Sequence, residues 1–226
     1  MKRSCFVFPL SLLPLAAFAQ VNYSEGFQGS VGAEWSSTST IIVKSAANRI
    51  ALGNFGNQTV TLTLGGFTPG VLANLKFDLD LLDSWDGSDG TYGPDRFTAQ
   101  IDGTNVIDAT FSNLNENGFL QSYSAATPLG GPLVAAYTNA DETDTLDQSY
   151  YGNSVYKFGG GINPGFSFLP ATSTVVFSFT ATGLQGNSDE SWALDNVSVV
   201  QSVPEPSTWA ALGFGVVALK RRRNRR

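Results

Sequence analysis

The feature that most constrains the fold is the period-two spacing of apolar residues through the middle of the chain. In the run 75–81, leucine or phenylalanine at every second position alternates with Lys76, Asp78 and Asp80. The runs 59–64 and 96–101 alternate in the same way. Successive side chains of a β-strand point to opposite faces, so this spacing is typical of strands with one buried face. Between residues 20 and 203 no helical spacing of comparable length is present.

Further apolar runs and turn signals complete an all-β pattern. The segments 175–179 and 192–200 predict two more strands, and Asp102-Gly103 is a strong hairpin signal between 96–101 and 105–111. About nine short strands separated by Gly, Asn, Asp and Ser predict a two-sheet antiparallel β-sandwich with jelly-roll topology. Residues 112–170 are less regular, and we expect one or two strands there, around 121–124 and 150–158, between exposed binding loops.

Composition excludes several classes of function. The 226 residues include no histidine, so Ser-His-Asp and Cys-His hydrolases and histidine-ligated zinc or haem cannot be built. Eight of the 13 Lys and Arg lie at the two ends, in 1–3 and 220–226. The chain between these two ends therefore contains five basic residues. It contains 18 of the 19 acidic residues when Glu205 is left out, so its formal charge is −13. Such a charge disfavours nucleic acid as a partner and favours divalent cations.

The N-terminus, residues 1–19, has the order of a secretory signal peptide. Lys2 and Arg3 precede an apolar run, and small residues precede Gln20. We expect a signal helix that is cleaved after Ala19 by signal peptidase. The one cysteine, Cys5, is removed with it, so the mature chain can form no internal disulfide.

The C-terminus, residues 203–226, joins a proline-rich polar stretch, an apolar segment and a basic cluster. Residues 203–219 number 17, the short limit for crossing a bilayer of about 30 Å. Trp209 suits the membrane interface, and the basic residues after Leu219 are expected to stay in the cytoplasm, which places the domain outside. We predict a short transmembrane helix, transient inner-membrane association through residues 207–219, and an Arg-rich cytoplasmic tail.

This C-terminal segment resembles the PEP-CTERM sorting signal of Gram-negative bacteria, through Val203, Pro204, Glu205 and Pro206. The resemblance implies recognition by an exosortase-type transpeptidase, which removes the tail and passes the protein to the cell surface or the extracellular matrix. The expected organisation is a signal peptide at 1–19, a β-sandwich domain at 20–202 and a sorting signal at 203–226. The expected route is export across the inner membrane, transient anchorage, and then the cell surface or extracellular space.

An acidic loop over residues 83–97 is one candidate calcium site. Asp83, Asp86 and Asp89 are closely spaced, and Asp95 joins them if the loop folds back. Calcium takes six to eight oxygen ligands, which carboxylates and carbonyls of a flexible loop supply, although the spacing here is not that of an EF-hand. The alternative is a solvated Asp-Gly turn whose carboxylates cap backbone amides.

A second candidate calcium site joins the ends of the domain. Residues 23–27 and 191–197 resemble the terminal strands of concanavalin-like and MAM-type jelly rolls, although the MAM cysteines are missing. The resemblance implies a structural calcium with Glu25, Asp195 and Asn196 as ligands. The alternative is that Asp195 and Asn196 cap a strand end through side-chain hydrogen bonds.

Aromatic residues on polar loops are candidates for carbohydrate binding, because a ring offers an apolar platform and nearby polar groups orient hydroxyls. Trp85, inside the acidic loop, and Tyr92 are the candidates here. Core packing is the alternative for such rings, and we expect Trp192 to be buried.

Catalysis finds little support in the sequence. A glycosidase needs only two carboxylates, but none of the possible pairs is distinguished. Nucleotide-binding loops, thiol motifs and nucleophile elbows are absent from the sequence. We therefore predict a non-catalytic, calcium-stabilised protein that is sorted to the surface and interacts with extracellular matrix or polysaccharide. A carboxylate-dependent glycan hydrolase or lyase on the same fold, and a structural matrix protein without a ligand, remain alternatives.

Overall fold

The computed structural model describes residues 21–115, 118–147 and 151–201. Residues Gln20–Ser202 form one compact unit. The predicted signal helix, transmembrane helix and Arg-rich tail lie outside the described residues. Within the described segments, no helix has the length and apolar character needed to cross a membrane.

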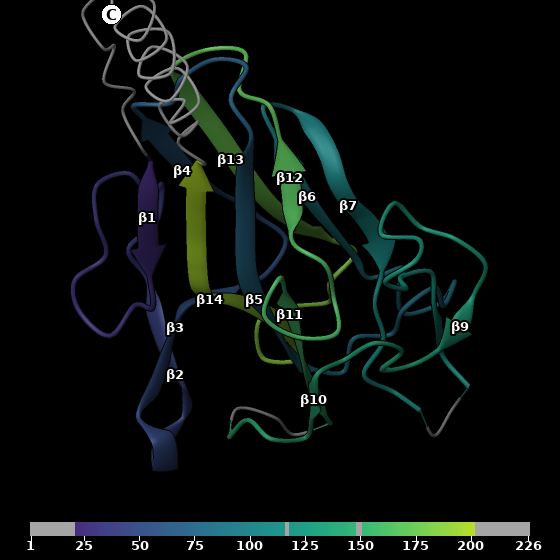
Figure 1. Ribbon diagram of the computed structural model, residues 1–226. Coiled ribbons are helices and arrows are strands. Elements are labelled where there is room, and N and C mark those ends of the chain that lie inside the picture. Colours follow the sequence, from purple (N-terminus) through teal and green to yellow (C-terminus); the bar gives the residue numbers. More distant parts are fainter. Residues whose placement is uncertain (1–20, 116–117, 148–150, 202–226) are drawn as a thin grey trace, which may run out of the picture. The chain divides into compact units, whose positions relative to one another are not determined.

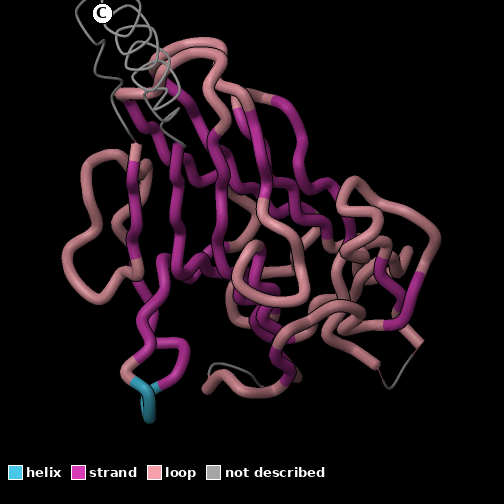
Figure 2. Tube along the Cα trace, in the orientation of Figure 1, coloured by secondary structure: helices cyan, strands magenta, loops and turns pink. Residues whose placement is uncertain are grey.

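The described chain is all-β, as the alternating sequence predicted (Figure 2). A single 3-10 turn, Ser45–Ala47, is the one helical element among the described residues. The strands are β1 Asn22–Glu25, β2 Thr40–Lys44, β3 Arg49–Phe55, β4 Thr59–Gly65, β5 Ala73–Asp83, β6 Arg96–Ile101, β7 Thr104–Thr110, β8 Leu120–Gln121, β9 Val134–Ala135, β10 Glu142–Thr143, β11 Asn153–Phe158, β12 Phe166–Phe168, β13 Thr174–Thr182 and β14 Glu190–Gln201.

The larger sheet is built around β5 and β14 (Figure 1). Its strand order is β10-β11-β5-β14-β3-β2, with β12 also paired to β5 and β1 also paired to β14. The antiparallel register of β5 and β14 runs from Glu190 opposite Asp83 to Gln201 opposite Ala73. The first and last strands of the domain are neighbours, as predicted, because β1 pairs with the second half of β14.

The smaller sheet has the order β4-β13-β6-β7 and packs on the larger one as a sandwich. Asp102-Gly103 closes the predicted hairpin between β6 and β7, and both residues have positive φ, as a type I′ turn requires. Aromatic contacts join the two sheets. The rings of Phe77 and Phe179 meet edge to face at 5.1 Å, and those of Phe97 and Trp192 at 5.4 Å.

Residues 112–170 contain more strands than the sequence predicted. The expected strand at 150–158 is present as β11, and β8 occupies the start of the other expected segment. The additional strands β9, β10 and β12 have two or three residues each. Segments this short cannot display a period-two pattern, and only their pairing with neighbouring strands reveals them.

The outer face of the larger sheet is covered where β5 ends, contrary to the prediction of strands with one buried face. Asp80 is fully buried and Asp78 nearly so. A second apolar cluster, comprising Val43, Ala51, Leu82, Leu146, Val155 and Ala193, covers the same face. The two edges of the sheet meet here, because Asp147, shortly after the edge strand β10, donates its amide to the carbonyl of Val43 in the opposite edge strand β2.

Candidate functional site

Three buried carboxylates converge at one end of the sandwich, and we call them the carboxylate cluster: Asp86, Asp95 and Glu190. Asp86 lies in the loop after β5, Asp95 immediately precedes β6, and Glu190 is the first residue of β14. Each side chain offers an oxygen within 4.8 Å of those of the other two. Asp95 and Glu190 are 0% exposed and Asp86 is 5% exposed. The cluster therefore joins segments from both sheets.

Core packing next to Asp86 and Glu190 positions two of these carboxylates. Trp85 is buried, and its indole N–H donates to the carbonyl of Ser191 at 2.9 Å. This bond ties the residue before Asp86 to the residue after Glu190. In the sheet, Glu190 lies opposite Asp83, the last residue of β5.

The loop between β5 and β6 folds back on itself to bring Asp95 to Asp86. The amide of Asp95 donates to the Gly87 carbonyl at 2.8 Å, and the amide of Asp86 donates to Oδ2 of Asp95. The amide of Phe111 donates to the Asp95 carbonyl at 3.1 Å. These bonds hold the Asp95 backbone between the loop and the residue that follows β7.

Two oxygens of the cluster are buried without a hydrogen-bond partner: Oδ1 of Asp95 and Oε1 of Glu190. Their sister oxygens each accept a backbone N–H, from Asp86 and from Gln185 respectively. Buried polar atoms almost always have partners, so each exception requires an explanation such as a bound ion or water.

Burial dominates the electrostatics of the cluster. It raises the pKa of Asp86 to about 6, of Asp95 to about 7 and of Glu190 to about 9. Repulsion by neighbouring carboxylates contributes to all three raised pKa values, whereas hydrogen bonding with Glu190 opposes the rise at Asp86 and Asp95. The ion pairs formed by described residues use Arg49, Arg96 and Lys157, and none of them reaches this cluster.

The structure thus brings together only some of the carboxylates predicted for the calcium loop. Asp86 and Asp95 meet, whereas Asp89 caps the turn, its Oδ2 accepting the amides of Thr91 at 2.6 Å and Tyr92 at 2.8 Å. Those hydrogen bonds hold the pKa of Asp89 below its ordinary value. Asp83 ends β5 and is not part of the cluster.

Glu190 was not predicted, because it lies 95 positions beyond Asp95 in the sequence. A local signal was available, since Glu190 is an acidic residue directly before an apolar strand pattern. Nothing in the sequence indicated which carboxylates it would meet.

The second predicted set, Glu25, Asp195 and Asn196, lies on or beside the paired strands β1 and β14. Glu25 Oε1 accepts the amide of Phe27 at 2.8 Å, and Asn196 Nδ2 donates to Asp78 at 2.8 Å. Asp195 accepts from Arg49 Nε at 2.8 Å. The cation in contact with Asp195 is therefore a guanidinium, and calcium binding by this set stays a prediction.

The two aromatic candidates differ in exposure. Trp85 is 0% exposed, so the prediction of a sugar platform at Trp85 is wrong: the ring packs in the core, and its N–H is used by Ser191. Trp192 is buried, as expected. Tyr92 is 57% exposed, and its carbonyl accepts from Gln185 Nε2 at 3.2 Å.

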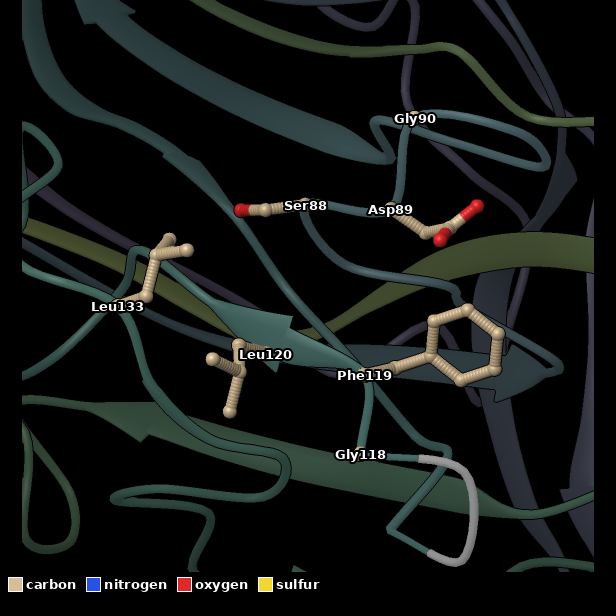
Figure 3. Close-up of a pocket in the computed structure, with 7 residues that line it drawn as sticks. All are labelled: Ser88, Asp89, Gly90, Gly118, Phe119, Leu120 and Leu133. Carbon is tan, nitrogen blue, oxygen red and sulfur yellow. The ribbon is translucent and has the colours of Figure 1, made fainter.

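A pocket of about 230 Å³ lies beside the same loop (Figure 3). The amide of Ser88 donates to the Leu120 carbonyl at 2.7 Å, which joins its two walls. The Phe119 ring and the Asp89 carboxylate lie on the same side of the pocket. Its lining residues are Ser88, Asp89, Gly90, Gly118, Phe119, Leu120 and Leu133.

Comparison with known proteins identifies the C-terminal segment. Residues 202–226 match the PEP-CTERM protein-sorting motif, which confirms the predicted sorting signal. No curated protein sequence matches the chain significantly.

Solved structures similar to the domain include carbohydrate-binding and adhesin domains. A GH26-CBM35 beta-(1,4)-mannanase of Podospora anserina is 11% identical with a TM-score of 0.32, covering 84% of this chain but only 29% of that protein. A family 35 carbohydrate-binding module of Clostridium thermocellum is 10% identical (TM-score 0.31, coverage 80% and 97%). The K3 cleaved adhesin domain of Lys-gingipain of Porphyromonas gingivalis is 14% identical (TM-score 0.36, coverage 80% and 99%).

Proposed function

We propose that this chain is an exported protein, sorted to the cell surface or extracellular matrix, whose jelly-roll domain is a non-catalytic, calcium-stabilised module that interacts with polysaccharide. The observation that carries export and sorting, the firmest part of the proposal, is the sorting motif at residues 202–226. A sorting motif of this kind is removed by an exosortase-type transpeptidase, and the processed domain is the functional part. Its core lies within residues 21–199, so the domain from Gln20 to Ser202 is a unit that can be studied by itself.

The burial of the carboxylate cluster supports a non-catalytic role. Hydrolysis of a glycosidic bond by two carboxyl groups requires both to reach the bond in the substrate. Asp95 and Glu190 are fully buried, and Asp86 is nearly so. A polysaccharide chain at the surface therefore has no access to them.

The exposed part of the same loop supports an interaction with polysaccharide. Tyr92 presents an exposed ring, and the lining of the neighbouring pocket includes the Phe119 ring and the Asp89 carboxylate, which lie on the same side in Figure 3. Apolar rings stack on sugar faces while hydroxyl and carboxylate groups orient sugar hydroxyls. The strongly negative domain favours neutral glycans over polyanionic ones, because like charges repel.

A glycan array combined with a reducing-sugar assay on residues 20–202 tests this proposal. We expect binding of a neutral glycan without release of reducing ends. Tyr92→Ala should weaken binding by roughly two- to tenfold, the size of one aromatic contact. Tyr151→Ala is the matched control, because Tyr151 is 55% exposed and lies outside this loop and pocket.

The other outcomes of the same assay contradict the proposal. Turnover of a glycan would favour a hydrolase or lyase, and the absence of both binding and turnover would favour a structural matrix protein. Equal losses in the two tyrosine variants would remove Tyr92 from the binding surface.

A further inference from the structure

We propose that Asp86, Asp95 and Glu190 form a calcium site that fastens the start of β14 to the loop between β5 and β6. The inference rests on the calcium part of the proposed function and supplies its location. The site differs from both sets predicted from sequence, because it includes Glu190 and leaves out Asp83, Asp89, Glu25, Asp195 and Asn196.

The separation of the three carboxylates suits calcium. Ca–O distances are about 2.3–2.6 Å, so two oxygens on opposite sides of one ion are at most about 5 Å apart. The oxygens of Asp86, Asp95 and Glu190 lie within 4.8 Å of one another. One calcium ion among them can therefore contact all three, and water or backbone carbonyls can fill its remaining positions.

The unpartnered oxygens are the independent observation that points to an ion. Oδ1 of Asp95 and Oε1 of Glu190 belong to side chains that are 0% exposed, and neither has a hydrogen-bond donor. Each sister oxygen is already held by a backbone amide, which fixes the carboxylate in place. A cation would satisfy both unpartnered oxygens at once, whereas the alternative within the cluster is a proton that Glu190 shares with Asp86 or Asp95.

The charge of the cluster leads to the same conclusion. Three carboxylates lie together in the interior with no basic partner among the described ion pairs. Burying an unpaired charge is costly, and buried charges are normally paired or bind a metal. When all three groups are ionised, a divalent cation offsets two of the three negative charges. Oxygen-only ligands favour calcium over softer metals, and calcium tolerates irregular geometry that magnesium does not.

The position of the site explains what the ion would do. Asp95 leads into β6 of the smaller sheet, and Glu190 begins β14 at the centre of the larger sheet. Bridging them closes a segment of 96 residues, from 95 to 190, at a point where the two sheets meet. The unfolded chain loses the most entropy when a long loop is closed, so such a bridge stabilises the folded domain.

The test is calcium binding by residues 20–202 that have been freed of metal with a chelator. At a free calcium concentration of about 100 times the Kd, mass action adds about 2.7 kcal/mol to stability. That corresponds to a rise in melting temperature of roughly 5–11 °C for a domain of this size. Magnesium at equal ionic strength should raise it less. Terbium should luminesce when tryptophan is excited, because Trp85 adjoins Asp86 in the chain.

Two variants and a matched control locate the site. Asp95→Asn and Glu190→Gln keep an oxygen for the backbone amide but remove one charge each, and both should lose most of the calcium shift and the terbium signal. Without metal they should melt no lower than the wild-type domain, since repulsion is relieved, so a lost response does not mean a lost fold. Asp102→Asn removes an exposed charge at the β6–β7 turn and should keep the full response.

Several outcomes overturn the inference. These are no calcium shift in the wild-type domain, equal shifts with magnesium, or an undiminished shift in Asp95→Asn and Glu190→Gln. Loss of the shift in Glu25→Gln with Asp195→Asn, but not in Glu190→Gln, would move the ion to the paired strands. Glycan binding is measured separately, so a failure of this site and a failure of the polysaccharide interaction are distinguishable.

Discussion

Two arginines show how burial changes the contribution of an arginine–aspartate ion pair to stability. Arg49 is 16% exposed in its side chain and contacts Asp80 at 2.7 Å and Asp195 at 2.8 Å, both of them buried. Burial raises the pKa of Asp80 to about 7, although Arg49 opposes that rise. Arg96 pairs with Asp108 near the surface, where the two side chains are 43% and 27% exposed. Arg49 therefore neutralises charges that have no access to water.

Replacing each arginine by methionine should separate these two situations. Arg49→Met leaves Asp80 and Asp195 without a cation, and we expect it to lower the free energy of unfolding by about 3–5 kcal/mol. Arg96→Met removes a solvent-screened pair, and we expect a loss below about 1 kcal/mol. Urea denaturation measures both values. If Arg49→Met lowered the free energy of unfolding as little as Arg96→Met, the buried ion pairs of Arg49 with Asp80 and Asp195 would contribute no more to stability than the exposed pair.

At the scale of elements, the turns and strand ends carry constraints that the strand pattern does not. Gly103, in the β6–β7 turn, has φ of 78°, and a Cβ added there meets nothing within 4 Å. Gly183, just after β13, has φ of 94°, and a Cβ there would overlap the carbonyl oxygen of Pro94. The close approach at Gly183 sets the position of the backbone that carries Asp95. Gly103 is therefore needed for the conformation of its own turn, whereas Gly183 is needed for the position of the backbone next to the carboxylate cluster.

Alanine at these two glycines should have different consequences. Gly103→Ala should cost about 1 kcal/mol, from the left-handed backbone alone. Gly183→Ala should cost about 1–3 kcal/mol more, because the overlap pushes Pro94 and Asp95 aside. It should also reduce the calcium-induced rise in melting temperature, which Gly103→Ala should leave unchanged. Denaturation with and without calcium checks both points, and equal behaviour of the two variants would separate Gly183 from the site.

At the scale of the whole molecule, a charged domain and a sorting motif are joined in one chain. The chain between its two basic ends carries a formal charge of −13. The eight basic residues of the ends lie in the expected signal peptide and tail. Processing at both ends would therefore convert a chain of formal charge −6 into a strongly acidic domain. High net charge favours the solubility of such a domain.

Replacing Glu205 by alanine should block processing of the C-terminus. Glu205 lies between Pro204 and Pro206 in the matched motif, so we expect normal export but accumulation of an unprocessed, membrane-associated form. Fractionation of the cells followed by immunoblotting measures this. Glu34→Ala, in the sandwich domain, is the control and should be processed like the wild-type protein. Release of Glu205→Ala at the wild-type rate would contradict recognition of the motif.

The fold and the sorting motif followed from the sequence because both depend on local order. Alternation in 59–64, 75–81 and 96–101 sets which side chains share a face, and the hairpin at Asp102-Gly103 needs only neighbouring residues. The motif at 202–226 is likewise continuous. In the acidic loop, the spacing of Asp86 and Asp95 allowed them to meet.

What the tertiary structure alone decided is the burial and partners of residues far apart in the chain. The register of β14 on β5 places Glu190 opposite Asp83, at the start of the acidic loop, although Glu190 lies 95 positions after Asp95 in the chain. The same register places the Ser191 carbonyl on the indole of Trp85, which turned an expected surface ring into a core residue. Arg49 reaches Asp195 because β3 lies beside β14. Such long-range pairings depend on the packing of whole sheets, which no local pattern of residues specifies.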